Sequence, residues 1–193
     1  MLLLILGLVL FLGTHSVRIA AEPWRLGMIE RLGPQAWKGL YSAIALVGLV
    51  LIVLGYGSAR TAPIELWPTS TGARHLASLL TLLSFILVTA AYVPANRIRA
   101  RLRHPMVIGV KLWAGAHLIS NGTVADLLLF GTILVWAVLN FRAARIRDRA
   151  GAAIQPAAGL MSRDLIVVGA GVALWGLFAF HLHARWIGVS PMG

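Results

Sequence analysis

Two histidines within long apolar stretches are the residues best placed to do chemistry in this chain. His15 lies in the segment Gly13–Ser16, and His117 belongs to an apolar run that begins at Pro105. A neutral imidazole can enter an apolar environment and still present a nitrogen lone pair, so either side chain suits a metal ion or a haem iron. The alternative for each is a histidine that hydrogen-bonds to a neighbouring helix.

The residues around His117 indicate a flat ligand or a close helix contact. Four residues recur at helical spacing and so share one face: Gly109, Trp113, His117 and Asn121. Small residues on this helix would let a flat macrocycle or another backbone approach. The alternative is a packing face with one polar contact.

Asp126 opens the apolar run that follows the Asn121–Gly122 turn. Its carboxylate suits a helix cap or a hydrogen bond to that turn. The functional alternative is support for His117, in which the carboxylate accepts an N–H from the imidazole and fixes its tautomer.

His104 stands between Arg103 and Pro105, where an apolar run begins. The structural interpretation is an interfacial residue that caps the following helix. The alternative is contact with a phosphate or an anionic cofactor beside Arg101 and Arg103.

The other histidines and the absent motifs exclude several kinds of catalytic and metal-binding site. His75, His181 and His183 lie at the borders of apolar runs, where histidines are usually solvated. The chain has no cysteine, which excludes disulfides, thiolate catalysis, Fe–S clusters and covalent haem attachment. It also has no HExxH motif, paired carboxylates, glycine-rich phosphate loop or serine nucleophile elbow.

The elements that must position these residues are membrane helices. Hydrophobic residues make up 59% of the chain and charged residues 12%, whereas a soluble domain carries about a quarter charged residues. We therefore predict an all-α, polytopic membrane helical bundle. A helix needs about 20 residues to cross about 30 Å of hydrocarbon. The candidate spans are residues 1–20, 39–59, 75–95, 105–120, 123–141 and 164–184.

The basic residues predict how these six spans are oriented. Those that follow the odd-numbered spans are Arg25, Arg31, Lys38, Arg97, Arg99, Arg101, Arg103, Arg142, Arg145, Arg147, Arg149 and Arg163. Those that follow the even-numbered spans are Arg60, Arg74 and Arg185. The positive-inside rule then places the richer loops in the cytoplasm and both termini outside. The net charge of +11 lies in these clusters at a membrane surface, so no nucleic-acid partner is expected.

The first apolar run is similar to the hydrophobic region of a signal peptide. It lacks the basic residues that usually precede such a region, so we expect a retained helix. The alternative is cleavage near Ala20–Ala21.

A set of short motifs runs through most of residues 1–140. They are Gly13-Thr14-His15-Ser16 with Arg18, Tyr41-Ser42, Arg103-His104-Pro105, Gly109, Leu112-Trp113-Ala114, His117-Leu118, Asn121-Gly122, Ala125-Asp126-Leu127 and Leu129-Phe130-Gly131. Together they resemble the NnrU family, and the stretch from Arg103 to Gly131 is the most specific part. The resemblance implies a single NnrU-like transmembrane domain over residues 1–193, with its core in 1–140, a linker at 142–163 and a last helix at 164–184.

The resemblance also implies a cellular role and a cofactor. Bacterial members are inner-membrane proteins associated with nitrite and nitric oxide reduction in denitrification, so components of the respiratory nitrite and nitric oxide reductases are expected partners. The family includes the plastid 15-cis-zeta-carotene isomerase, which holds haem b between histidines. Its ligand motifs fall on His15 and His117, with His104 as a further shared histidine, while its cysteine near the second ligand has no counterpart here. The expected supporting residues are Asp126, Asn121, Trp113 and Arg103.

Two other functions stay open at this point. Arg103-His104-Pro105 followed by Gly109 is similar to the RHPxxxG element of isoprenylcysteine and phospholipid methyltransferases, although this chain has few of the acidic residues that those enzymes need. The second is a non-catalytic partner that helps to assemble a respiratory complex. The sequence therefore does not decide whether the protein is an enzyme.

Overall fold

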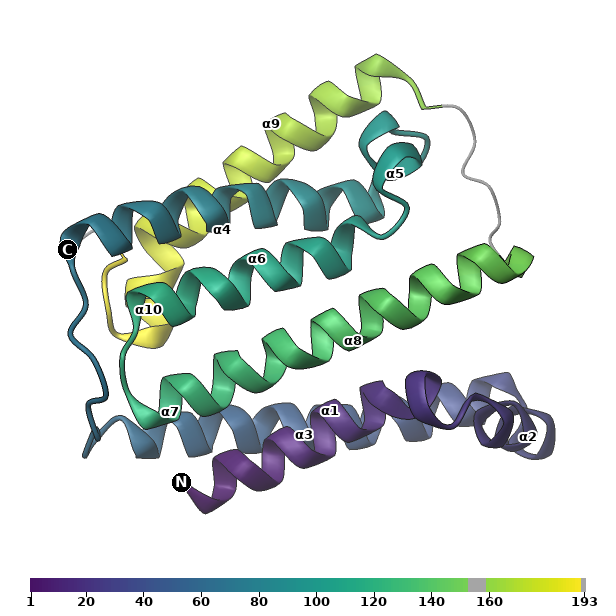
Figure 1. The fold of residues 1–193 in the computed structure, drawn as a ribbon, viewed down its shortest axis with the longest axis horizontal. Helices are drawn as coiled ribbons and strands as arrows, with labels where there is room; N and C mark the ends of the chain where they lie inside the picture. Colours follow the sequence, from purple (N-terminus) through teal and green to yellow (C-terminus); the bar gives the residue numbers. More distant parts are fainter. Residues whose placement is uncertain (153–158, 192–193) are drawn as a thin grey trace. The chain divides into compact units, whose positions relative to one another are not determined.

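A computed structural model describes residues 1–152 and 159–191, and within those ranges the chain is built from helices without a β-strand. Figure 1 shows their order along the chain. The helices are α1 (Leu2–Ala20), α2 (Glu22–Leu32), α3 (Pro34–Ala59), α4 (Thr71–Tyr92), α5 (Arg97–Leu102), α6 (Pro105–Ser120), α7 (Val124–Asp126), α8 (Thr132–Arg147), α9 (Met161–Leu177) and α10 (His183–Ile187), with π-helical turns η1 (Leu127–Gly131), η2 (Asp148–Ala152) and η3 (Phe178–Leu182).

Five of these helical segments are long and apolar enough to cross a membrane. They are Leu2–Ala20, Pro34–Ala59, Thr71–Tyr92, Val124–Gly151 and Met161–Ile187. Their outer faces are apolar: Val9 on α1 is 64% exposed and Val53 on α3 is 62% exposed. Such faces match hydrocarbon rather than water. The chain is therefore a multi-pass membrane protein with a lipid bilayer as its surroundings.

The predicted spans each coincide with a helix, but α6 is shorter than the others. It has 16 residues, or about 24 Å at 1.5 Å per residue, which is less than the roughly 30 Å thickness of a hydrocarbon core. Its bounds agree with the predicted span 105–120. The short connection after it, where the Asn121–Gly122 turn was predicted, is also present.

The chain divides into two compact units, which we describe separately. Unit 1 comprises Met1–Trp67 and Thr123–Asn140, and unit 2 comprises Pro68–Gly122 and Phe141–Gly193. His15 and Asp126 belong to unit 1, whereas His104 and His117 belong to unit 2.

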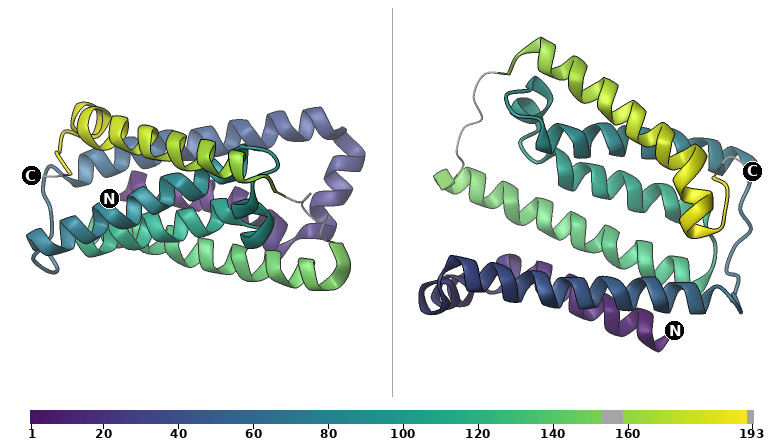
Figure 2. Two further views of the ribbon diagram at one scale, coloured as in Figure 1. Left: turned by 90° about the horizontal axis from the view of Figure 1, so that it is seen from above. Right: turned by 180° about the vertical axis from the view of Figure 1, so that it is seen from behind.

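Unit 1 is built on a close contact between α1 and α3, which run side by side (Figures 1 and 2). Glycines on both helices lie against the partner backbone. A Cβ added at Gly7 would come within 2.6 Å of the Ile52 nitrogen, and one added at Gly48 within 2.7 Å of the Phe11 nitrogen. Because lipid provides no hydrophobic force between helices, this close van der Waals contact of two backbones stabilises the pair.

Unit 2 is built on α4, which packs against α6 and against α9. The Ser84 hydroxyl on α4 is buried and donates a hydrogen bond of 2.8 Å to the carbonyl of Gly109 on α6. On the α9 side, a Cβ added at Gly171 would come within 2.7 Å of the Ile86 Cα. Small residues thus allow the close approach of α4 to both neighbours.

Two short helices, α2 and α5, were not predicted from the sequence. The side chain of Asn96 caps the start of α5 by accepting from the Arg99 N–H at 2.7 Å. Asp164 at the start of α9 accepts from the Arg97 N–H at 2.7 Å, so a carboxylate distant in sequence completes this cap. The six-residue helix therefore depends on a tertiary contact with α9.

The linker predicted at 142–163 is helical at both of its ends. The helix α8 continues through Arg147 and is followed by the turn η2, while α9 begins at Met161. Residues 153–158 of this linker lie outside the described residues. Helix α3 likewise begins at Pro34, before the predicted start at residue 39, because proline is favoured in the first turn of a helix.

Candidate functional site

His15 lies on α1 and is held by its own helix. Its Nδ1 is 2.7 Å from the Phe11 carbonyl oxygen, one turn earlier. A carbonyl oxygen can only accept, so Nδ1 carries the proton and donates. The lone pair of the neutral imidazole then lies on Nε2. A backbone carbonyl that fixes the tautomer in this way is a common support of metal-binding histidines.

Aromatic rings from three helices of unit 1 surround the His15 imidazole. The ring centroids of Phe11, Tyr41 and Trp136 lie 4.3, 5.3 and 5.9 Å from that of His15. The Trp136 ring stands edge-on at 88°. Its Nε1–H is buried, and no acceptor for it is found within the described ranges. Since a buried donor without an acceptor is costly, this position favours a bound group that carries an acceptor atom.

His117 on α6 of unit 2 repeats the arrangement of His15. Its Nδ1 lies 2.8 Å from the Trp113 carbonyl oxygen, so Nδ1 donates and the lone pair lies on Nε2. The Trp113 and His117 rings are 4.7 Å apart. Asn121 donates from Nδ2 to the His117 carbonyl at 2.9 Å. These contacts link Trp113, His117 and Asn121 of the predicted face, whereas Gly109 lies against Ser84 of α4.

Asp126 is a buried carboxylate that closes the start of α7 in unit 1. One of its oxygens accepts from the Thr123 N–H at 2.9 Å, and the Thr123 hydroxyl accepts in turn from the Asp126 N–H at 3.2 Å. This reciprocal pair is a capping box, which confirms the capping interpretation. The other oxygen accepts from the Tyr56 hydroxyl on α3 at 2.5 Å. Support of His117 by Asp126 stays a prediction.

We expect Tyr56→Phe to destabilise unit 1 by about 1–3 kcal/mol, because it leaves one oxygen of a buried carboxylate without its donor. Thermal unfolding of the detergent-purified protein measures the effect. Tyr92→Phe is the matched control, since Tyr92 is 73% exposed. Equal melting temperatures for the two variants would refute a stabilising Tyr56–Asp126 hydrogen bond.

His104 and Arg103 meet a second carboxylate in unit 2. The Asp148 Oδ2 lies 3.1 Å from His104 Nε2 and 3.5 Å from Arg103 Nη1. Arg145, one turn before Asp148, approaches the same oxygen at 3.6 Å. His104 does occupy the N-cap position of α6, but its side chain makes no capping hydrogen bond. The predicted capping position of His104 is therefore confirmed, while its imidazole contacts Asp148 rather than an N–H of the helix.

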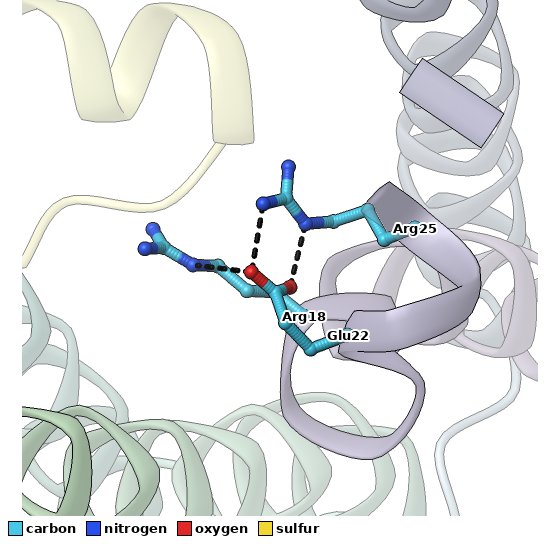
Figure 3. Close-up of polar contacts among 3 residues, drawn as sticks. All are labelled: Arg18, Glu22 and Arg25. Atoms are coloured by element: carbon cyan, nitrogen blue, oxygen red, sulfur yellow. Dashed lines mark hydrogen bonds and ion pairs between the residues drawn. The ribbon is translucent and has the colours of Figure 1, made fainter. Parts of the chain in front are cut away.

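A third charged cluster joins α1 to α2 in unit 1, and Figure 3 shows its geometry. The Arg25 guanidinium donates to both oxygens of Glu22 at 2.6 and 2.8 Å, and Arg18 approaches the same carboxylate at 4.0 Å. The hydrogen bond from Arg25 to Glu22 raises the pKa of the Arg25 guanidinium, so this pair stays charged. The cluster lies where α1 meets α2, and the sequence analysis did not predict it.

The three remaining histidines, His75, His181 and His183, lie apart from the His15, His117 and His104 sites. His75 and His181 are exposed, and His183 donates from Nδ1 to the Val189 carbonyl at 2.7 Å. Among the residues that the structure describes, no group of three or more histidine, aspartate or glutamate side chains could hold a metal ion.

Comparison with known proteins assigns the family of this helical bundle. The model of the NnrU family, described as NnrU protein, matches residues 3–191 of the 193-residue chain. The chain belongs to the NnrU family. No curated protein and no solved structure matches it. The NnrU match extends well beyond the motifs in 1–140 and includes the last helix, so the family resemblance covers both units.

Proposed function

We propose that this NnrU-family protein binds haem b, with His15 and His117 as axial ligands, and serves nitrite and nitric oxide metabolism in the bacterial inner membrane. The observation that carries the proposal is the shared tautomer of the two histidines. In each, the Nδ1–H is donated to the carbonyl one turn earlier, so Nε2 has the lone pair that iron needs. Both histidines come from helices in an apolar protein, where an ionisable side chain is costly without a function.

The residues around His15 fit a haem in a second respect. Phe11, Tyr41 and Trp136 would provide apolar and aromatic surface for a porphyrin ring, and the buried Trp136 Nε1–H is a donor without an acceptor among the described residues. The protein would hold the ring, exclude water and set the environment of the iron. Bound haem b would supply one-electron chemistry at iron. The association with denitrification rests on the family.

Haem content of the purified protein tests this proposal. The full chain is expressed in a haem-producing host, purified in detergent, and assayed as the pyridine complex of the released haem. We expect about one haem b per chain, since two axial histidines complete one iron. A folded preparation without haem would overturn the proposal. Circular dichroism, which must show a helical protein, distinguishes that result from a misfolded sample.

We further propose that α6 completes a sixth span and that both termini lie outside, as the charge distribution indicates. Because the chain has no cysteine, single cysteines report topology without a background. With a maleimide that cannot cross the membrane, we expect Thr69→Cys to be labelled in intact spheroplasts and Arg149→Cys only after lysis. The reverse pattern would contradict this orientation, and Thr69→Cys and Arg149→Cys labelled alike would contradict placing the two loops on opposite sides.

A further inference from the structure

Two arginines and one histidine converge on one carboxylate oxygen in unit 2. Arg103 and His104 precede α6, whereas Arg145 and Asp148 stand at the end of α8. All three side chains contact Asp148 Oδ2, at 3.1 Å for His104, 3.5 Å for Arg103 and 3.6 Å for Arg145. We call these four residues the Asp148 cluster.

The Asp148 cluster carries more positive than negative charge. One carboxylate faces two guanidiniums, which leaves an excess of +1 even when His104 is neutral. The sequence provides unit 2 with two acidic residues, Asp148 and Asp164, and Asp164 is already used to cap α5. Neighbouring acids therefore do not balance this charge.

The two guanidiniums keep the capacity to bind a further anion. Their distances to Asp148 exceed the roughly 2.7–3.2 Å of an N–H···O hydrogen bond. The side chains of Arg103 and Arg145 are 39% and 41% exposed, whereas that of Asp148 is 9% exposed. An external ligand can therefore reach the arginines, while the carboxylate beneath them holds the two like charges close together.

The backbone at Arg103 is held in an unusual conformation. Its φ of +62° lies in a region that side-chain-bearing residues rarely adopt, and such strain persists where the surroundings enforce it. The next residues, His104 and Pro105, begin α6. The Arg103 backbone is thus set beside the first turn of an apolar helix, and the ends of such helices are where we expect lipid phosphates.

We propose that Arg103, His104 and Arg145 form a binding site for a phosphate group, with Asp148 as the residue that positions them. Arginine forks match the paired oxygens of a phosphate, and the imidazole adds a further donor when protonated. The phosphate is expected to belong to an anionic phospholipid headgroup. A small soluble phosphate would use the same chemistry. The site is independent of haem and of the two intramembrane histidines.

Binding of fluorescent phosphatidylglycerol to the full chain in detergent tests the site. We expect Arg103→Gln and Arg145→Gln each to weaken binding roughly fivefold or more, since each removes one cation near the phosphate. Arg149→Gln is the matched control: it removes the same charge one residue after Asp148, at an exposed position outside the cluster, and should change binding less than twofold. Competition with unlabelled phosphatidylglycerol, phosphatidylcholine or inorganic phosphate distinguishes a lipid headgroup from a soluble phosphate.

One further variant, Asp148→Asn, and the separate reading of Arg145→Gln keep the test decisive. Asp148→Asn keeps a side-chain oxygen that can accept from the three neighbours but removes the negative charge that competes with a phosphate, so it is expected to tighten lipid binding. A merely structural ion-pair cluster predicts instead a less stable protein whose lipid binding is unchanged or weaker. Arg145→Gln leaves the strained Arg103 backbone untouched, so it reports on the site even if Arg103→Gln does not fold. Equal binding by the Arg145→Gln and Arg149→Gln variants would overturn the proposal.

Discussion

His15→Ala and His117→Ala are each expected to abolish most of the haem absorption of the purified protein. Each substitution removes one proposed axial nitrogen and leaves the iron with a single protein ligand. Changes in the partners of metal-binding histidines already weaken affinity by about 10–100-fold, so loss of a ligand should lower haem occupancy by at least roughly tenfold. The Soret band of detergent-purified protein, normalised to protein concentration, measures occupancy.

His75→Ala provides the control for these two variants. His75 is exposed at the start of α4 and should leave the Soret band unchanged. A Soret band of normal intensity in either the His15 or the His117 variant would refute that histidine as a ligand. Loss of the band in all three variants would point instead to a general effect on folding, which thermal unfolding of the same samples reports.

Gly55→Ala is expected to destabilise unit 1 strongly and to disrupt the contact of α1 with α3. Gly55 is buried, and a Cβ at this position would overlap the backbone of Leu4. Overpacking costs about 1–3 kcal/mol where side chains can move. Because the obstacle here is backbone, we expect about 3 kcal/mol or more. The measurement is thermal unfolding in detergent, together with proteolysis of the α1–α2 connection.

Gly57→Ala is the matched control on the same helix. Gly57 is exposed, and no atom outside its own helix segment lies within 4 Å of an added Cβ. Alanine favours a helix over glycine by about 1 kcal/mol, so this variant should be as stable as the parent or slightly more so. If Gly55→Ala melted at the same temperature as Gly57→Ala, the close α1–α3 contact would be refuted.

The main helices follow from the sequence because the membrane imposes a simple rule. A run of about 20 apolar residues must form a helix, since lipid cannot hydrogen-bond an open backbone. The predicted spans 1–20 and 105–120 therefore agree closely with α1 and α6. Pairing of the helices was less predictable. On α3, Gly48 and Gly55 pack against α1, whereas Gly57 faces outward. Only the three-dimensional arrangement distinguishes these glycines.

The short surface helices could not be predicted, because their stability comes from residues far apart in the chain. Helix α5 has only six residues, and its arginines at positions 97 and 101 repel each other one turn apart, so it would not form in isolation. Asp164, more than sixty positions later, caps its first turn. Asp148 similarly attracts His104 across 44 positions. Each contact depends on the packing of whole helices within unit 2.

The candidate site was predictable in part. His15 and His117 are conspicuous because ionisable residues are rare in apolar runs. The capping role of Asp126 follows from the turn before it, and the structure confirms it. In contrast, Tyr56 and Trp136 carry no local signal: a tyrosine and a tryptophan are ordinary in a membrane helix. Their importance comes from partners on other helices, Asp126 for Tyr56 and His15 for Trp136.

Electron paramagnetic resonance of the oxidised, haem-loaded protein is the most direct test of the proposed haem site. Two neutral imidazoles on one ferric iron produce a low-spin spectrum. We predict that signal in the parent protein and its conversion to a high-spin signal in whatever haem the His15→Ala or His117→Ala variant retains. A high-spin parent spectrum, or a low-spin spectrum that survives both substitutions, would contradict ligation of one haem by His15 and His117.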